Sequence, residues 1–204
     1  MNTNRDWVPC VFVLGSHLYV AGGRDMGMEH INIHDNTSAW TPSISPPHKV
    51  RYTSCVILKS IVILAGGSNG TSQLTSVITW KQGDTKWSSL PTMQQKRAIF
   101  CMVSDGVRYV YVVGGSASGR RLNSIERFDS QTNTWKDLRP MPLALQNHKC
   151  VYLNDIIYVT GGHNGTAKVN TIYLYKVTSD IWIKSTTLLQ EPVSGHAMVQ
   201  SITP

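Results

Sequence analysis

Short runs of apolar, largely β-branched residues recur along the chain, and each run ends at a pair of glycines. The runs cover residues 17–21, 61–65, 109–113 and 156–160, and the glycine pairs stand at 22–23, 66–67, 114–115 and 161–162. Short runs of this composition bounded by glycine are typical of β-strands. From one pair to the next the spacing is nearly constant, so the sequence repeats with a period of about 47 residues.

Aromatic residues keep a nearly fixed distance from each glycine pair. A tryptophan stands at the twentieth position after the second glycine in the last three repeats, as Trp87, Trp135 and Trp182, and at the seventeenth in the first, as Trp40. Another aromatic takes the thirteenth position in the last three repeats, as Trp80, Phe128 and Tyr175, and His34 matches it in the first. We expect the tryptophans to be core residues that pack between neighbouring units.

The cysteines lie upstream of the glycine pairs, at nearly the same place in every repeat. Cys10, Cys55, Cys101 and Cys150 precede the first glycine by twelve, eleven, thirteen and eleven positions. Equivalent positions in separate units would point their side chains the same way, so we expect these cysteines not to pair. Each is predicted to be a small, buried, apolar filler of a first strand. Without a Cys-x-x-Cys motif, a zinc site is disfavoured.

Each period has room for four short strands. In the second repeat they are expected at about residues 53–59, 60–65, 74–80 and 86–90, with an Asn-Gly turn at 69–70 that the fourth repeat matches at 164–165. One four-stranded sheet cannot bury both of its faces alone, so neighbouring sheets must stack. Radial stacking of such sheets is a β-propeller.

The glycine pair, the midway aromatic and the later tryptophan resemble the kelch repeat, and residues 124–135 are an especially close match. The resemblance covers about residues 6–202. It implies an all-β kelch propeller as a single domain of residues 1–204, with four-stranded blades at about 6–47, 48–93, 94–142 and 143–190. The repeat's structural residues are then the four tryptophans and the glycines Gly22, Gly23, Gly66, Gly67, Gly114, Gly115, Gly161 and Gly162.

A further first-type strand is expected at residues 195–201, so a fifth blade begins after the fourth. Propellers of the kelch family that this sequence resembles are typically closed rings of five to seven blades. The chain is therefore expected to be an incomplete propeller, a fragment of a larger chain. The alternative is a compact four-bladed ring with one surplus strand.

Composition narrows the classes of partner. Lys and Arg number 19 against 12 Asp and Glu, a net charge of +7, but the basic residues are scattered singly or in pairs. No basic run suggests a nucleic-acid tail. Apolar stretches such as residues 61–65 and 109–113 are far shorter than the roughly 20 residues of a membrane helix. We expect neither nucleic acid nor a membrane as partner, and no signal peptide.

Signals for catalysis and metal binding are weak. The seven histidines include no His-x-His and no His-Glu-x-x-His, and glycine-rich residues 114–119 precede a strand rather than a helix. Ser194 with His196, and His148 with Cys150, bring nucleophile and base types together, but we expect no catalysis there. We expect no enzyme activity, no cofactor and no metal. A copper oxidase of the kelch fold is a distant alternative that needs ligands from a much longer chain.

In kelch adaptors that this sequence resembles, the loop leading into each first strand and the loop after each glycine pair share the binding face. The matching residues are Arg51, Arg97, Gln146 and Ser194 in the lead-in loops, and Arg24, Asp25, Ser68, Asn69, Ser116, Arg120, Arg121, His163 and Asn164 after the glycines. This set is basic, so an acidic peptide or acidic protein surface is the expected partner. The alternative is that Arg51 and Arg97 brace neighbouring loops through backbone carbonyls.

The resemblance implies a non-enzymatic protein-interaction module, namely the substrate-recognition part of a Kelch-like adaptor of a cullin-RING ubiquitin ligase. In that family the cullin machinery binds a BTB domain and a BACK region, which this sequence does not contain. The alternative is an actin-binding or cytoskeletal scaffold. The expected location is the cytoplasm, or the cytoskeleton for the scaffold.

Overall fold

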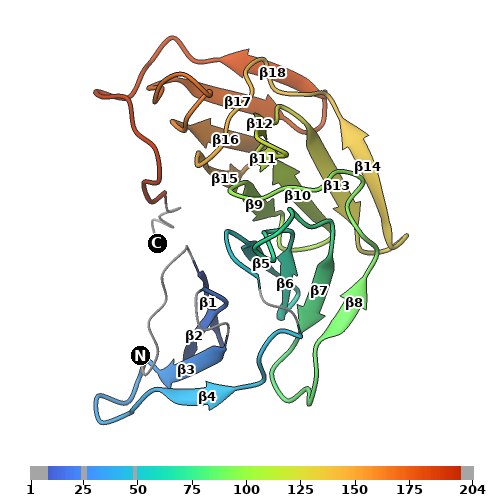
Figure 1. The fold of residues 1–204 in the computed structure, drawn as a ribbon, viewed down its shortest axis with the longest axis vertical. Helices are drawn as coiled ribbons and strands as arrows, with labels where there is room; N and C mark the ends of the chain where they lie inside the picture. The colour runs from blue at the N-terminus through green and yellow to red at the C-terminus, as the bar shows by residue number, and fades with distance from the viewer. Residues whose placement is uncertain (1–8, 24–26, 48–49, 199–204) are drawn as a thin grey trace. The chain divides into compact units, whose positions relative to one another are not determined.

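A computed structural model describes residues 9–23, 27–47 and 50–198. The chain divides into two compact units, unit 1 (Met1–Ala98) and unit 2 (Ile99–Pro204). All regular structure in the described residues is β-strand (Figure 1). Among these residues no helix is long and apolar enough to cross a membrane.

Unit 1 contains two four-stranded antiparallel sheets, called blade 1 and blade 2, whose strands pair in chain order. Blade 1 consists of β1 (Cys10–Leu14), β2 (His17–Ala21), β3 (Met28–Asn32) and β4 (Thr41–Ser43). Blade 2 consists of β5 (Ser54–Leu58), β6 (Ile61–Ala65), β7 (Val77–Trp80) and β8 (Ser88–Leu90). Phe12, Tyr19 and Trp80 belong to one buried cluster that joins the two blades.

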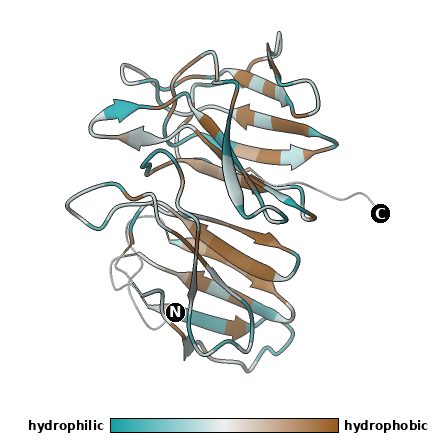
Figure 2. Cartoon of the chain, turned by 90° about the vertical axis from the view of Figure 1, so that its right-hand side faces the viewer, coloured by the Kyte–Doolittle hydropathy of each residue, from teal (hydrophilic) through white to brown (hydrophobic). Residues whose placement is uncertain are grey.

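Unit 2 repeats this arrangement in blade 3 and blade 4. Blade 3 consists of β9 (Cys101–Ser104), β10 (Tyr109–Val113), β13 (Ile125–Asp129) and β14 (Thr134–Leu138), and blade 4 of β15 (Lys149–Leu153), β16 (Ile156–Thr160), β17 (Ile172–Lys176) and β18 (Ile181–Lys184). A small hairpin of β11 (Ser116–Ala117) and β12 (Arg120–Arg121) follows β10. Strands such as β6 and β10 are largely apolar, whereas β8 and β14 carry more polar residues (Figure 2).

The described residues therefore confirm the predicted all-β class and its four-stranded blades, and each sheet lies within the range expected for its blade. That both units form one domain stays a prediction. The predicted strand at 195–201 is not formed over residues 195–198, and residues 199–201 lie outside the described residues.

Two of the tryptophans tie their blade to the one before it. The Trp87 indole Nε1 donates a hydrogen bond to the Ile44 carbonyl at 2.8 Å, and Trp182 Nε1 donates to the Arg139 carbonyl at 2.7 Å. In both cases the acceptor follows the preceding blade's tryptophan by four positions. Trp87 is buried, whereas Trp182 is half-buried.

The expectation that the cysteines do not pair is wrong. Disulfides join Cys10 to Cys55 and Cys101 to Cys150, with Cα atoms 5.9 and 6.0 Å apart. Each one links the first strands of consecutive blades, β1 to β5 and β9 to β15.

The strand registers give the physical reason for these pairs. Cys10 and Cys101 lie opposite the residue directly before the glycine pair, Ala21 and Val113. Cys55 and Cys150 lie one position further along, opposite Leu64 and Val159. A shift of one residue turns a strand side chain to the other face of its sheet, so one cysteine of each pair points forward and the other points back.

Candidate functional site

The lead-in loops of blades 2 and 4 each pair with the loop after their own glycine pair. In blade 2 the Arg51 N–H donates to the Ser68 carbonyl at 3.0 Å, and the Ser68 N–H donates to the Arg51 carbonyl at 2.8 Å. In blade 4 Gln146 and His163 exchange the same two bonds, at 3.1 and 2.8 Å. The two loop types predicted to share a face therefore lie side by side. We call them the unit 1 rim (Arg51 and residues 68–73) and the unit 2 rim (Gln146 and residues 116–121 and 163–168).

The glycine pairs permit this close approach. Gly67 has φ +90°, and a Cβ there would lie 2.6 Å from the Arg51 carbonyl oxygen. Gly162 has φ +102°, and a Cβ there would lie 2.8 Å from the Cβ of His148. A side chain at either position would push the lead-in loop away from the rim.

The rim loops are held in shape by their own side chains. The Asn69 Oδ1 accepts hydrogen bonds from the Thr71 and Ser72 N–H groups, both at 2.9 Å. Asn164 Oδ1 accepts in the same way from residues 166 and 167, both at 2.8 Å. These amide oxygens shape the Asn-Gly turns, and that Asn69 and Asn164 contact a partner stays a prediction.

Cationic side chains lie over and beside these turns. The Arg51 Nη1 is 3.9 Å from where a Cβ of Gly70 would be, and the Arg121 Cδ is 3.7 Å from the same place at Gly165. Arg121 Nη1 also donates to the Gly119 carbonyl at 3.2 Å. Arg120 is exposed, and the unit 2 rim contains no acidic residue. This rim is therefore a braced surface with exposed positive charge.

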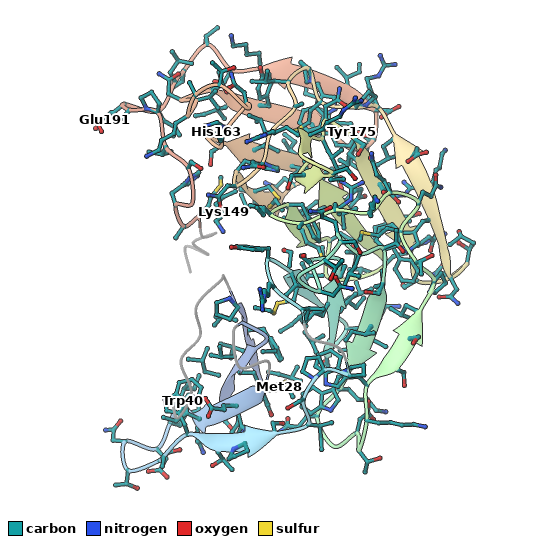
Figure 3. The ribbon with its side chains drawn as sticks, in the orientation of Figure 1. Met28, Trp40, Lys149, His163, Tyr175 and Glu191 are labelled. Carbon is teal, nitrogen blue, oxygen red and sulfur yellow. A yellow bond between two sulfur atoms is a disulfide. The ribbon has the colours of Figure 1, made fainter. Side chains whose placement is uncertain are left out.

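Lys168 is a rim residue that the sequence reasoning missed. It is exposed and pairs with His163 across the loop, as Gln73 pairs with Ser68 and Arg121 with Ser116. The repeat could have located it, because Lys168 follows Gly162 by six positions, as Arg121 follows Gly115. Figure 3 shows His163 on the loop after β16, at the other end of blade 4 from Tyr175.

Arg97 lies elsewhere than predicted. Its side chain has 0% exposure, its N–H donates to the Leu74 carbonyl at 3.1 Å, and its carbonyl accepts from the Gly67 N–H at 2.8 Å. In unit 2 the equivalent two bonds belong to Leu145, an interior residue. The alignment on the cysteines was displaced here, because Cys101 lies one strand position earlier than Cys55, opposite Val113 rather than the residue before it. Arg97 is thus not part of the exposed rim.

Ser194 continues the chain as the lead-in of another blade would. The Val193 carbonyl accepts from the Gly162 N–H at 2.7 Å, as the Leu145 carbonyl accepts from Gly115. Ser194 Oγ accepts from Asn147 Nδ2 at 3.1 Å, so it is engaged within unit 2. Arg24 and Asp25 lie outside the described residues.

The histidine and cysteine pairs considered for catalysis have structural roles. Cys150 is held in a disulfide, and His196 Nε2 shares a hydrogen bond of 2.8 Å with Thr160 Oγ1. Burial, and then the nearby positive charge of Lys149, lower the pKa of His196. Among the described residues no three His, Cys, Asp or Glu side chains are grouped to hold a metal ion.

At the other end of the blades, ionisable groups brace turns. Arg108 donates two hydrogen bonds to Asp129, at 2.9 and 2.5 Å, and this contact holds the pKa of the Asp129 carboxyl well below its usual range. Tyr111 is fully buried, which raises its pKa to about 12. Tyr175 donates to Asp180, which also accepts from the Arg139 N–H at 3.0 Å.

Comparison with known proteins matches residues 53–202 to the family model described as the KLHDC2/KLHL20/DRC7 Kelch-repeats domain. The chain is 26% identical over 131 residues to Kelch-like protein 33 of Homo sapiens, covering 62% of this chain and 24% of that protein. It is 24% identical over 173 residues to Kelch domain-containing protein 10 of Homo sapiens, covering 78% of this chain and 38% of that protein. Kelch-like protein 36 of Mus musculus is 25% identical over 151 residues, covering 70% and 24%. The chain thus spans about a quarter to two fifths of these relatives.

Proposed function

Because the chain belongs to the KLHDC2/KLHL20/DRC7 Kelch-repeats domain family, a protein-interaction fold, we propose that it recognises an acidic segment of a partner protein through its rims. The observation that carries the proposal is the positive charge of the unit 2 rim, where Arg120 and Lys168 are exposed, Arg121 is half-buried beside them, and the rim contains no acidic residue. A guanidinium offers several donors in a plane, which suits carboxylate groups.

The same proposal makes the chain the substrate-recognition part of a cullin-RING ubiquitin ligase adaptor in the cytoplasm, without enzyme activity of its own. It rests on the family and on relatives named Kelch-like. The cullin would be bound by BTB and BACK regions of the whole protein. Actin is the alternative partner, and co-sedimentation of this chain with purified actin filaments would favour that role.

The rim proposal is tested with a fluorescein-labelled peptide of alternating Glu and Gly, followed by fluorescence anisotropy. Arg120→Ala combined with Lys168→Ala should weaken binding several-fold and leave the melting temperature unchanged, because both side chains are exposed. Lys136→Ala combined with Lys184→Ala is the matched control, since both lysines are exposed on outer strands away from the rim. Equal losses in the two double variants, or none in the first, would reject the rim as the binding surface.

A further inference from the structure

The two disulfides occupy equivalent places in the two units but differ in how far solvent reaches them. Cys101 and Cys150 are both buried, with 7% and 8% exposure. Cys10 is buried at 3%, whereas its partner Cys55 is only half-buried. The strands around them differ as well, because the first four residues of β5 are half-buried and the first three of β9 are buried.

Access decides whether a disulfide reacts. Thiol–disulfide exchange needs a thiolate to reach one sulfur of the pair, so a pair of two buried cysteines is better protected than a pair in which one cysteine is half-buried. Cys55 is the most exposed of the four cysteines.

The accessible pair lies next to a rim. Cys55 follows the rim residue Arg51 by four positions, and β5 is the strand that Arg51 leads into. β1 and β5 belong to different sheets, so no ladder of backbone hydrogen bonds joins them. Without the disulfide, these strands would be held by the side-chain packing of one buried cluster, and their blades by the Trp87–Ile44 hydrogen bond as well.

We propose that Cys10–Cys55 is a reversible thiol-exchange site that responds to the glutathione couple and sets the order of the unit 1 rim, while Cys101–Cys150 is a permanent brace. A glutathione thiolate attacks the Cys55 sulfur, which forms a mixed disulfide there and releases the Cys10 thiolate. A second glutathione thiolate attacks the glutathione sulfur of that mixed disulfide, which releases oxidised glutathione and the Cys55 thiolate. Two electrons pass to the protein, and both thiolates can take protons from solvent. Oxidised glutathione reverses the sequence.

The first test follows exchange at each pair. The oxidised chain is incubated in reduced glutathione, free thiols are capped with N-ethylmaleimide without denaturation, and peptides are quantified by mass spectrometry. Cys10 and Cys55 should become labelled at least ten-fold faster than Cys101 and Cys150, and the difference should vanish in denaturant. Equal rates in the folded chain, faster opening of the other pair, or a difference that survives unfolding would overturn the proposal.

The second test asks whether the rim responds. Amide hydrogen exchange of peptides covering residues 50–68 should increase when Cys10–Cys55 is opened by glutathione, while peptides covering 145–163 stay protected. The paired variant Cys10→Ser with Cys55→Ser should reproduce this increase without glutathione. If amide exchange at residues 50–68 stayed unchanged in the wild-type chain after the disulfide had opened, the proposal that Cys10–Cys55 sets the order of the unit 1 rim would be wrong. Neither readout involves a partner, so failure of the proposed acidic ligand leaves both tests intact.

Discussion

His30 on β3 lies in a small cluster of aromatic rings, and its charge state responds to pH. Its ring centroid lies 5.1 Å from that of His17 and 5.3 Å from that of Tyr19. Burial, and then the positive charge of His17, lower the pKa of His30 below its ordinary value. The folded chain therefore binds this proton less readily than the unfolded chain does. A ring that is held neutral in this way makes the unit more sensitive to acid.

The sign of the pH dependence follows from linkage. Above about pH 6.5 His30 is neutral in both states and adds no slope, but as pH falls below that value the unfolded chain takes up the proton first. Stability should therefore decline from about pH 6.5 towards the lowered pKa of the folded state. His30→Gln should flatten the fall of the melting temperature between about pH 7 and pH 5, followed by circular dichroism. His34→Gln, at an exposed turn, is the control and should keep the wild-type slope. A slope in His30→Gln equal to that of the wild type would contradict this account.

Within each unit, an indole N–H of the second blade donates a hydrogen bond to a backbone carbonyl of the first blade. This tryptophan therefore holds two neighbouring blades together. Trp87 is buried at 8% and donates to Ile44 of the preceding blade. Trp87→Ala should lower the free energy of unfolding by about 3–5 kcal/mol, because it removes a large buried ring and leaves a cavity. Trp87→Phe keeps most of the packing and should lose less, including about 1 kcal/mol for the hydrogen bond.

Urea denaturation of these variants measures both values, with Trp182→Ala as the comparison. Trp182 makes the same kind of bond from a half-buried position, so its loss should be smaller than that of Trp87. A larger loss at Trp182 than at Trp87 would show that burial does not govern the energy of this brace.

Strands and loops at this scale also show what the sequence could and could not predict. The apolar runs before each glycine pair located β2, β6, β10 and β16, because a buried strand needs consecutive apolar residues and its end needs glycine. That the loops of Arg51 and Ser68 lie on one face followed from the resemblance to kelch adaptors. The cysteine pairs and the interior place of Arg97 did not follow, since both depend on small shifts in strand register. The unequal cysteine spacings of twelve, eleven, thirteen and eleven positions were the visible trace of those shifts.

At the scale of the whole molecule, each unit has its own core and its own covalent link. The buried cluster around Tyr19 and the Cys10–Cys55 disulfide lie in unit 1, and the cluster around Tyr111 and Cys101–Cys150 lie in unit 2. The disulfides span sequence separations of 45 and 49. Closing a loop of this size removes chain entropy from the unfolded state worth about 4 kcal/mol.

This division predicts that the units lose stability separately. Cys101→Ser with Cys150→Ser should lower the free energy of unfolding of unit 2 by about 4 kcal/mol, because its unfolded chain regains the freedom of the open loop. Amide exchange of β10 and β16 as a function of urea reports unit 2, and that of β2 and β6 reports unit 1 in the same sample. Protection of β2 and β6 should stay at the wild-type level. An equal loss in both sets of strands would mean that the chain unfolds as one cooperative body, with stability shared across all four blades.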